Sequence, residues 1–306
     1  MFLRISLSIL VSVIYLSGEN RFEQSITPSK VYKEVTNLHE EINLIKEHFN
    51  KKAMPTYVDI KTKLLPRHAW QRTYEIFVKI NILREKYNLP IIEPVNMEPT
   101  LELDPTFTYE QVLRLLQEVR ILKLRFGITK KIETQAEYSN KTPSDVYNAL
   151  NLLSRELDII NGKEFTPSHV FAEVIRIYED FDAILNRLKI TNPTTPPIKN
   201  QKDTPTQSYH VALELLESIR KLELSVGLQS VDFYAFRRKK INPSDVFEIT
   251  QIILAELQLF KAYIGLHHTI TRGAKRYHNK TPADVTQMMR WLLKKSKQIN
   301  LLTYKR

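Results

Sequence analysis

The chain of 306 residues contains no cysteine and only six glycines. Without cysteine it can form neither a disulfide nor a thiolate metal site, so its stability has to come from buried apolar side chains. A chain so poor in glycine has no glycine-rich phosphate loop, and a His-Glu-x-x-His zinc motif is absent as well. The sequence therefore predicts no cofactor and no metal site.

Long hydrophobic runs are also missing beyond the first residues of the chain. Residues 1–4 form a short charged start, and residues 5–16 form an apolar run that is too short for an ordinary membrane-spanning helix. We interpret residues 1–18 as a secretory signal peptide, with an uncleaved N-terminal membrane anchor as the alternative. Export without disulfides fits the bacterial periplasm, so we expect an exported, periplasmic protein.

The sequence does contain one short phrase that is used repeatedly. It reads Thr-Pro-Ser-Asp-Val-Tyr at residues 142–147, and near copies lie at residues 27–32, 166–171, 242–247 and 281–286. The Thr or Asn oxygen can accept a hydrogen bond from a free amide of the first helical turn, and proline suits the first helical position because its φ is fixed. The phrase therefore predicts helix starts, with the capping residues Thr27, Thr142, Thr166, Thr204, Asn242 and Thr281.

The helix-starting prolines recur with a regular spacing. They are Pro28, Pro66, Pro105 and Pro143 in the first half of the chain, and Pro167, Pro205, Pro243 and Pro282 in the second. Within each half the period is nearly constant, and every proline of the first half recurs after the same interval, as Pro167 follows Pro28 and Pro282 follows Pro143. We interpret this pattern as a tandem duplication of a four-helix unit with a period of about 38 residues, in which residues 19–162 are followed by residues 163–306.

The helix ends are marked as regularly as the starts. Asn88, Gly127, Gly227 and Gly265 all lie at the same distance after their proline, and each is followed by an apolar residue. A left-handed Gly or Asn before an apolar residue is typical of a Schellman helix end. We therefore expect an all-α fold of eight amphipathic helices of about 22 residues, each about 33 Å long.

The linkers leave two arrangements open. Most are about 16 residues long, enough to run back along a whole helix, so that successive helices would be parallel. Alternatively each linker holds a short second helix, as in a helix-pair solenoid. We favour two four-helix bundles, because each period contains one strong amphipathic run. The short connection before Pro167 predicts that the helices starting at Pro143 and Pro167 are antiparallel neighbours.

The positive charge is concentrated near the C-terminus. From Asp232 to Arg306, fifteen Lys and Arg residues stand against five acids, so this part carries +10 of the formal net charge of +11. Two linkers of this part supply a candidate anion-binding face: Arg237, Arg238, Lys239, Lys240, Arg272, Lys275, Arg276 and Lys280. An anionic component of the envelope or an acidic protein is the partner that this face would suit, ahead of nucleic acid. The alternative is a solvated basic loop.

Catalytic motifs are hard to find. The one histidine cluster, His267, His268 and His278, lies on a linker and lacks a metal-ligand spacing. We therefore expect a non-enzymatic, exported helical-repeat protein that acts as a binding or scaffold module of the bacterial cell envelope. A periplasmic sensory module that holds a small molecule between helices is the first alternative. A hydrolase that uses the linker histidines is the second.

Overall fold

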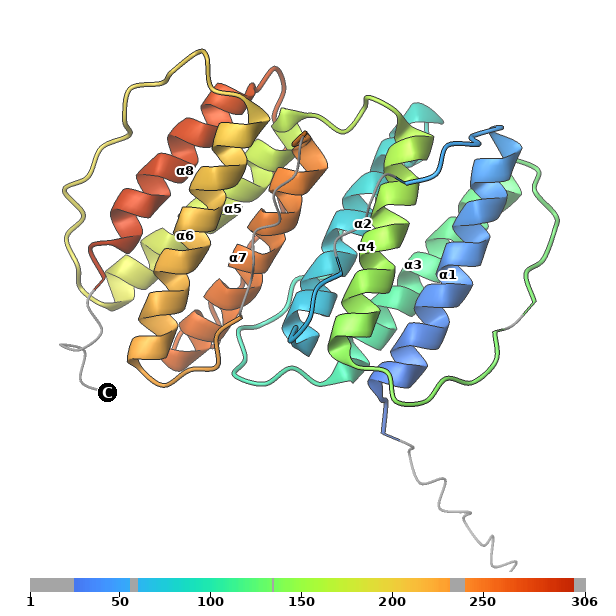
Figure 1. Ribbon diagram of the computed structural model, residues 1–306, viewed down its shortest axis with the longest axis horizontal. Coiled ribbons are helices and arrows are strands. Elements are labelled where there is room, and N and C mark those ends of the chain that lie inside the picture. Colours follow the sequence, from blue (N-terminus) through green and yellow to red (C-terminus); the bar gives the residue numbers. More distant parts are fainter. Residues whose placement is uncertain (1–24, 56–59, 134, 232–239, 300–306) are drawn as a thin grey trace, which may run out of the picture.

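The computed structural model describes residues 25–55, 60–133, 135–231 and 240–299, which form eight α-helices and no strand (Figure 1). They are α1 (Pro28–His48), α2 (Pro66–Lys86), α3 (Pro105–Arg125), α4 (Pro143–Asn161), α5 (Pro167–Arg187), α6 (Pro205–Ser225), α7 (Pro243–Tyr263) and α8 (Pro282–Ser296). The predicted all-α fold with its internal duplication is confirmed, and the helices contain 15 to 21 residues. The predicted signal peptide lies outside the described residues. No described helix is long and apolar enough to cross a membrane.

Three helix starts are capped in both directions. Thr142 Oγ1 accepts a hydrogen bond from the Asp145 N–H at 3.3 Å, and Asp145 Oδ2 accepts one from the Thr142 N–H at 2.8 Å. The same reciprocal pair forms between Asn242 and Asp245 in α7 and between Thr281 and Asp284 in α8. Each pair gives a partner to amide groups that the helix itself leaves free.

The other helix starts use related solutions. Thr27 accepts a hydrogen bond from the Lys30 N–H, and the N–H groups of Thr166 and Thr204 are bound by the side chains three residues later. The starts at Pro66 and Pro105 were predicted, but the residues that cap them were not. Asp104 caps α3 by accepting from the Thr106 N–H at 2.8 Å, and His68 Nδ1 accepts from the Leu65 N–H at 2.9 Å in α2. A side chain inside the helix thus compensates for a leucine that cannot cap.

The helix ends follow the Schellman pattern. Asn88, Gly127, Gly227 and Gly265 have φ angles between 56° and 80°. The next N–H then bonds to a carbonyl five residues earlier, as from Ile128 to Lys123 at 2.9 Å. Asn50 and Lys189 end α1 and α5 in the same way, with φ angles of 53° and 56°.

The four helices of each group run in parallel. Pro28, Pro66, Pro105 and Pro143 surround one cavity of about 10 Å³, so all four helices of the first group begin at the same end. At the other end the rings of Phe49, Tyr87 and Phe126 pack together, with centroids 4.7 to 5.7 Å apart. In the second group, Pro167, Pro205, Pro243 and Pro282 surround an equivalent cavity. Each group is therefore a parallel four-helix bundle.

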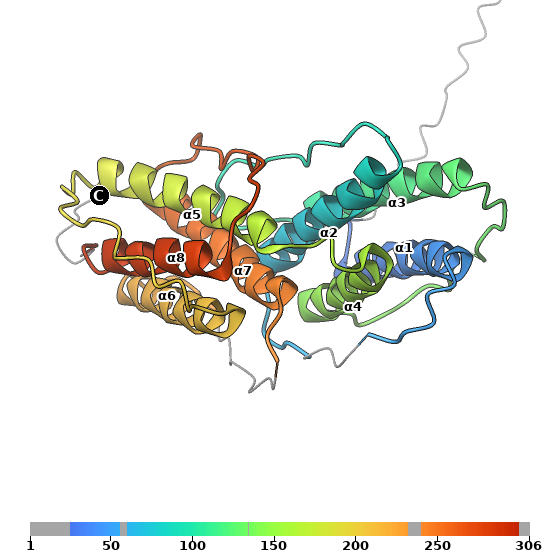
Figure 2. The same ribbon diagram turned by 90° about the horizontal axis from the view of Figure 1, so that it is seen from above.

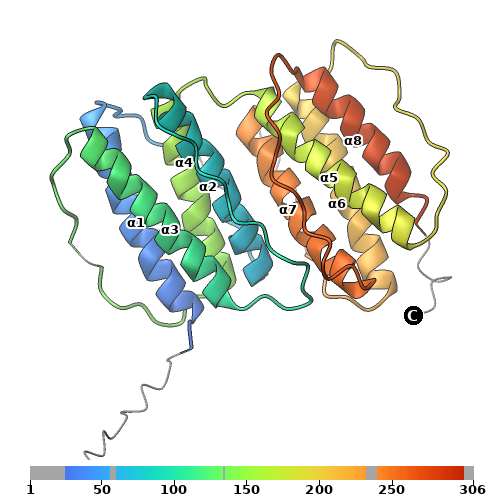
Figure 3. The same cartoon turned by 180° about the vertical axis from the view of Figure 1, so that it is seen from behind.

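The helix contacts repeat from one bundle to the other. In the first bundle, α1 and α2 each pack against α3 and α4, and in the second, α5 and α6 each pack against α7 and α8. The long linkers run back along these helices, and their described residues contain no helix (Figures 1 and 3). For the described parts of the linkers, the solenoid alternative is therefore wrong, because these segments return the chain to the starting end of the bundle.

Equivalent contacts attach the last linker of each bundle. The Lys141 N–H donates to Ser29 Oγ at 3.0 Å, and the Lys280 N–H donates to Ser168 Oγ at 3.1 Å. The ammonium group of each lysine also lies 4.5 Å from the centre of an aromatic ring, Tyr32 in the first bundle and Phe171 in the second. Both the serines and the lysines are separated in the sequence by the interval of the duplication, so the contact was duplicated together with the helices.

The two bundles join through α2 and α7. These helices are antiparallel and are the only described helices of different bundles whose backbones pack together (Figure 2). The expected packing of α4 against α5 is wrong, because their short connection crosses from one bundle to the other (Figure 1). The physical reason lies in α7, which is buried from Ser244 to Ala262 and pairs its polar residues with α2 and α4 of the other bundle.

Two substitutions at helix ends should change the free energy of unfolding in opposite directions. Gly127→Ala places a side chain at a φ of 73° and should lower the free energy of unfolding by about 1 kcal/mol. Lys189→Gly removes a side chain from a φ of 56° and should raise it by a similar amount. Urea unfolding measures both. Gly273→Ala is the matched control, because its Cβ would meet only Asn96 Nδ2 at 4.0 Å, and it should change little.

Candidate functional site

Buried charges join the bundles along the contact between α2 and α7. The side chain of Lys79 is fully buried, and its Nζ lies 2.8 Å from Glu75 Oε1 and 2.6 Å from Asp158 Oδ1. The same ammonium donates to Ser244 Oγ in α7 at 3.1 Å. One lysine of α2 thus binds α4 and α7 at once. A buried charge that loses such partners destabilises a protein by about 3–5 kcal/mol.

Arg155 makes a second connection, from α4 to α7. Its Nη2 lies 2.9 Å from Asp245 Oδ1 and 3.0 Å from Glu248 Oε2. Gln71 of α2 donates to Gln251 of α7 at 2.8 Å in the same contact region. These polar pairs fix how far α7 is shifted along α2, because a slip by one turn would leave buried polar groups without partners.

A third cluster lies near the start of α2 and centres on Glu256. Glu256 Oε1 lies 2.7 Å from His68 Nε2 and 2.9 Å from Arg67 Nε. Burial lowers the pKa of His68, so this histidine is neutral, and its Nε2–H donates to Glu256 while Nδ1 caps α2.

Glu256 has a second carboxyl group beside it, that of Glu223 at the end of α6. Burial and the charge of Glu256 raise the pKa of Glu223. Burial acts to raise the pKa of Glu256 too, but its contacts with His68 and Arg67 outweigh burial and lower that pKa. The pair therefore holds one proton, on Glu223.

A cleft of about 960 Å³ opens at the other end of the α2–α7 contact. One wall is the second half of α2 with residues 91–96 of the linker that follows it. The facing wall is the start of α5 with residues 273–279 of the linker between α7 and α8. The cleft is thus lined by both bundles, and both of its walls include linker segments. Figure 3 shows the ribbons of the linker after α2 and of the linker between α7 and α8 on this side of the molecule.

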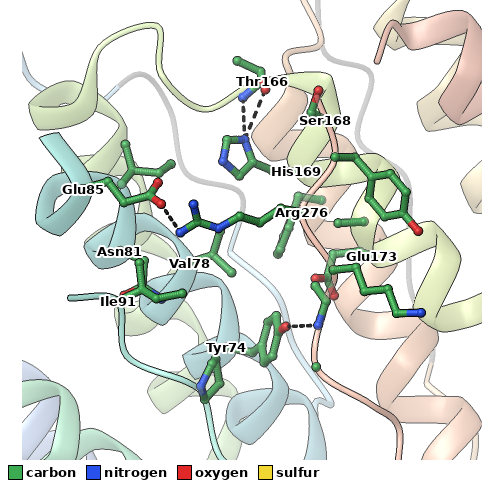
Figure 4. Close-up of a pocket in the computed structure, with 18 of the residues that line it drawn as sticks. Tyr74, Val78, Asn81, Glu85, Ile91, Thr166, Ser168, His169, Glu173 and Arg276 are labelled. Atoms are coloured by element: carbon green, nitrogen blue, oxygen red, sulfur yellow. Dashed lines mark hydrogen bonds and ion pairs between the residues drawn. The ribbon is translucent and has the colours of Figure 1, made fainter. Parts of the chain in front are cut away.

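Three contacts hold the linkers in place around the cleft. The side-chain amide of Asn81 forms two hydrogen bonds with the backbone of Ile92. Its Nδ2 donates to the Ile92 carbonyl at 2.7 Å, and its Oδ1 accepts from the Ile92 N–H at 2.9 Å. The Ala274 N–H donates to the Tyr74 hydroxyl at 3.0 Å. Arg276 forms an ion pair with Glu85 across the opening (Figure 4). The last contact joins the two walls.

The floor of the cleft is formed by Tyr74 and Glu173, both buried. The Arg176 guanidinium lies 4.0 Å from the centre of the Tyr74 ring, and Arg176 Nη1 and Gln251 Nε2 both donate to Glu173 Oε2, at 2.6 and 2.9 Å. Burial and the nearby Glu173 raise the pKa of Tyr74 to about 12. Burial also raises the pKa of Glu173. The floor therefore presents a neutral phenol beside a carboxyl group.

His169 lies on the α5 side of the cleft. Its Nδ1 accepts a hydrogen bond from the Thr166 N–H at 3.1 Å (Figure 4). Its ring stacks on Phe165 with centroids 5.1 Å apart. Burial lowers the pKa of this histidine, so it is neutral and carries its hydrogen on Nε2. His169 thus caps a helix with one nitrogen and has a donor left on the other.

The predicted anion-binding residues are not gathered in one place. Arg237, Arg238 and Lys239 lie outside the described residues, and Lys240 is exposed just before α7. The other four lie on the linker along α5, where Lys275 and Arg276 line the cleft. Arg276 is paired with Glu85 and Lys280 covers Phe171, which leaves Arg272 and Lys275 exposed and without an ion pair among the described residues.

The three linker histidines do not form a cluster. His267 and His268 follow α7 directly, and His268 Nδ1 lies 3.1 Å from Glu98. His278 lies further along the linker, which passes Asp180 at Thr271 and reaches Ser168 at Lys280. Since Asp180 and Ser168 are twelve residues apart on α5, the linker covers about 18 Å of that helix between these contacts. Among the described residues, no group of three or more acidic or histidine side chains is placed to hold a metal ion.

The sequence interpretation missed the residues of the cleft and of the buried network. Glu75, Lys79 and Arg155 look like members of a solvated helix face, because their partners lie on distant parts of the chain. One signal was available: apolar residues occur all round α7, between its polar ones, which indicates a helix covered by neighbours in every direction. No local pattern marked Tyr74, His169 or Glu173.

Comparisons with known proteins do not assign this chain to a family. No protein-family model, no curated protein sequence and no solved structure matches it. Its function therefore has to be inferred from the geometry of this chain alone.

The carboxyl pair gives opposite predictions for two conservative variants. Because Glu223 takes up a proton on folding, its contribution to stability is full at low pH and is lost as the pH rises above the ordinary glutamate range. Glu223→Gln needs no proton, so its stability relative to the unchanged chain should increase by up to about 1.4 kcal/mol per pH unit from pH 5 to pH 8. Glu256→Gln should instead be destabilising by about 3 kcal/mol.

Urea unfolding at several pH values measures both effects. Gln117→Glu on the exposed side of α3 serves as the control for a surface change, and its effect should vary little over this pH range. A Glu223→Gln variant that loses stability in parallel with the unchanged chain would contradict the raised pKa of Glu223.

Proposed function

We propose that this protein is a non-enzymatic binding protein of the bacterial cell envelope and that it holds its partner in the cleft between its two bundles. The proposal rests on the difference in volume between the cleft and the cavities inside the bundles. The cleft measures about 960 Å³, whereas the cavities where the four helices of each bundle begin measure about 10 Å³ each. Pockets that bind ligands usually have volumes of about 300–1,000 Å³.

The surroundings of the cleft support a scaffold role. The buried pairs of Lys79, Arg155 and Glu256 are satisfied within the fold and keep the bundles in one arrangement. A rigid frame of this kind reduces the ordering cost of binding. The envelope location rests on the sequence interpretation of residues 1–18 and on the absence of cysteine.

The alternative functions are less well supported. A sensory module that holds a small molecule between helices would have to use the same cleft, because the cavities at the helix starts measure only about 10 Å³ each. A hydrolase using the linker histidines would need them close together, but His268 and His278 lie at different places along α5. A binding role for the cleft needs no such cluster.

A second candidate partner follows from the exposed charges. Arg272 and Lys275 lie on the same linker, between α7 and α8, and have no ion-pair partner among the described residues. We propose that they contribute to contact with an anionic envelope component. Because Lys275 also lines the cleft, this contact and the cleft would share that residue.

Filling the cleft should abolish the binding of an amphipathic probe. Val78 lines the cleft, and Val78→Trp would occupy its apolar part. We expect 1-anilinonaphthalene-8-sulfonate to bind the full chain with a saturable fluorescence increase, and Val78→Trp to weaken this binding at least tenfold. Leu124→Trp, on the exposed face of α3, is the control and should bind like the unchanged chain. Equal binding by both variants would contradict the proposed site.

Reversing the exposed charges should weaken binding to anionic vesicles. The double variant Arg272→Glu and Lys275→Glu should sediment less with phosphatidylglycerol vesicles at low salt, because surface attraction depends on charge and is screened by salt. The matched control is Lys51→Glu and Lys52→Glu in the linker between α1 and α2 of the first bundle, where both lysines are also exposed. If both double variants lose binding equally, the attraction reflects net charge alone.

A further inference from the structure

Three hydrogen-bonding groups around the cleft lack a partner among the described residues. Glu173 is only 1% exposed, and its buried Oε1 makes no hydrogen bond. The Tyr74 hydroxyl accepts from Ala274 but has no acceptor for its own hydrogen. The Nε2–H of His169 likewise has no acceptor, since only Nδ1 of this ring forms a hydrogen bond. Glu173 Oε1 is the buried member of this set, and an unpaired buried polar atom is costly, whereas the half-buried His169 offers its free donor at the cleft wall.

The spacing of these groups suits an extended peptide backbone. His169 and Glu173 are four residues apart on α5 and therefore lie on the same face, about 6 Å apart along the helix axis. Alternate residues of an extended chain repeat about every 6.8 Å and present their N–H and C=O groups on the same edge. A donor at His169 and an acceptor at Glu173 match a carbonyl and an amide of such an edge.

The linkers at the sides of the cleft offer further backbone groups. In residues 94–96 and 275–279, no backbone N–H or C=O forms a hydrogen bond to another described residue. The two linkers approach each other at Gly273, whose Cβ position lies 4.0 Å from Asn96 Nδ2. Exposed backbone of this kind can pair with an added extended segment, as in β-augmentation.

Charge and apolar lining narrow the class of partner. Three cationic residues line the cleft, Lys86, Lys275 and Arg276, and four acidic residues do, Glu85, Glu93, Glu164 and Glu173. A lining of nearly balanced charge does not select a strongly anionic or cationic ligand. Val78, Ile82 and Phe247 add apolar contacts. The lining therefore complements a peptide with uncharged or apolar side chains.

We propose that the cleft binds an extended segment of polypeptide whose backbone pairs with Tyr74, His169 and Glu173. The inference rests on the proposed function and adds the class of partner to it. The α2 wall extends from Tyr74 to Lys86, about 18 Å at 1.5 Å per residue, which accommodates about five extended residues. The Arg276–Glu85 ion pair crosses the opening, and its side chains would move aside or cover the bound segment.

The test uses a defined peptide mixture as the probe. Tryptic peptides of denatured serum albumin are passed over the immobilised full chain, and retained peptides are identified by mass spectrometry. We expect the unchanged chain to retain peptides with apolar or uncharged side chains and Val78→Trp to retain few of them, while Leu124→Trp behaves like the unchanged chain. Tyr74→Phe and Glu173→Gln should each weaken the binding of a retained peptide about tenfold.

Backbone recognition is tested on the best retained peptide, synthesised with one N-methylated amide at a time. Methylation at alternate positions should weaken binding at least tenfold, because it removes the donor and blocks the edge. Thermal unfolding confirms that each variant is folded. If Glu173→Gln does not fold, the peptide affinity of Tyr74→Phe decides the test.

The failure of this inference differs from the failure of the proposed function. If 1-anilinonaphthalene-8-sulfonate binds in the cleft but Val78→Trp and the unchanged chain retain the same peptides, the peptide class is wrong and the binding cleft stands. Unchanged affinity for every N-methylated peptide would also overturn the inference. If neither the fluorescent probe nor any peptide distinguishes Val78→Trp from the unchanged chain, the proposed function fails as well.

Discussion

Buried charges hold the two bundles in one arrangement, and the cleft depends on them. Lys79 of α2 reaches partners on α4 and α7, Arg155 of α4 reaches partners on α7, and Glu256 of α7 reaches partners on α2. The side chains of all three are almost completely buried. In such surroundings a shifted register would leave a charge without a partner, so only one alignment of α2 with α7 is favourable. This alignment sets the second half of α2 opposite the start of α5, and the free space between the bundles opens there.

The parallel direction of the helices explains the linkers and so the walls of the cleft. Four parallel helices have their dipoles side by side, which is unfavourable, and charged side chains offset this. Aspartates lie in the first turns of α4, α7 and α8, and basic residues lie in the last turns of most helices. Each chain segment must return to the starting end, so a linker lies along the bundle after each of its first three helices. Two of these linkers became walls of the cleft.

The fold was largely predictable because its signals are local. A capping residue, a proline and a left-handed Asn or Gly act within a few residues, so Thr142, Pro143 and Gly127 indicate helix limits without knowledge of the rest. The packing of α4 against α5 was wrong because a short connection says only that two helix ends are near each other. The cleft was not predictable, since Tyr74, His169 and Glu173 come together only after α2 and α7 have paired.

The sequence by itself determined the eight helices, their starts and ends, and the duplication that arranges them in two sets of four. These features follow from hydrogen bonds and backbone angles between neighbouring residues. The tertiary structure alone decided that the helices of each set are parallel, that α2 joins α7, and that burial beside Glu256 raises the pKa of Glu223. The physical reason is that burial and charge pairing depend on residues far apart in the chain, whose distances no local pattern contains.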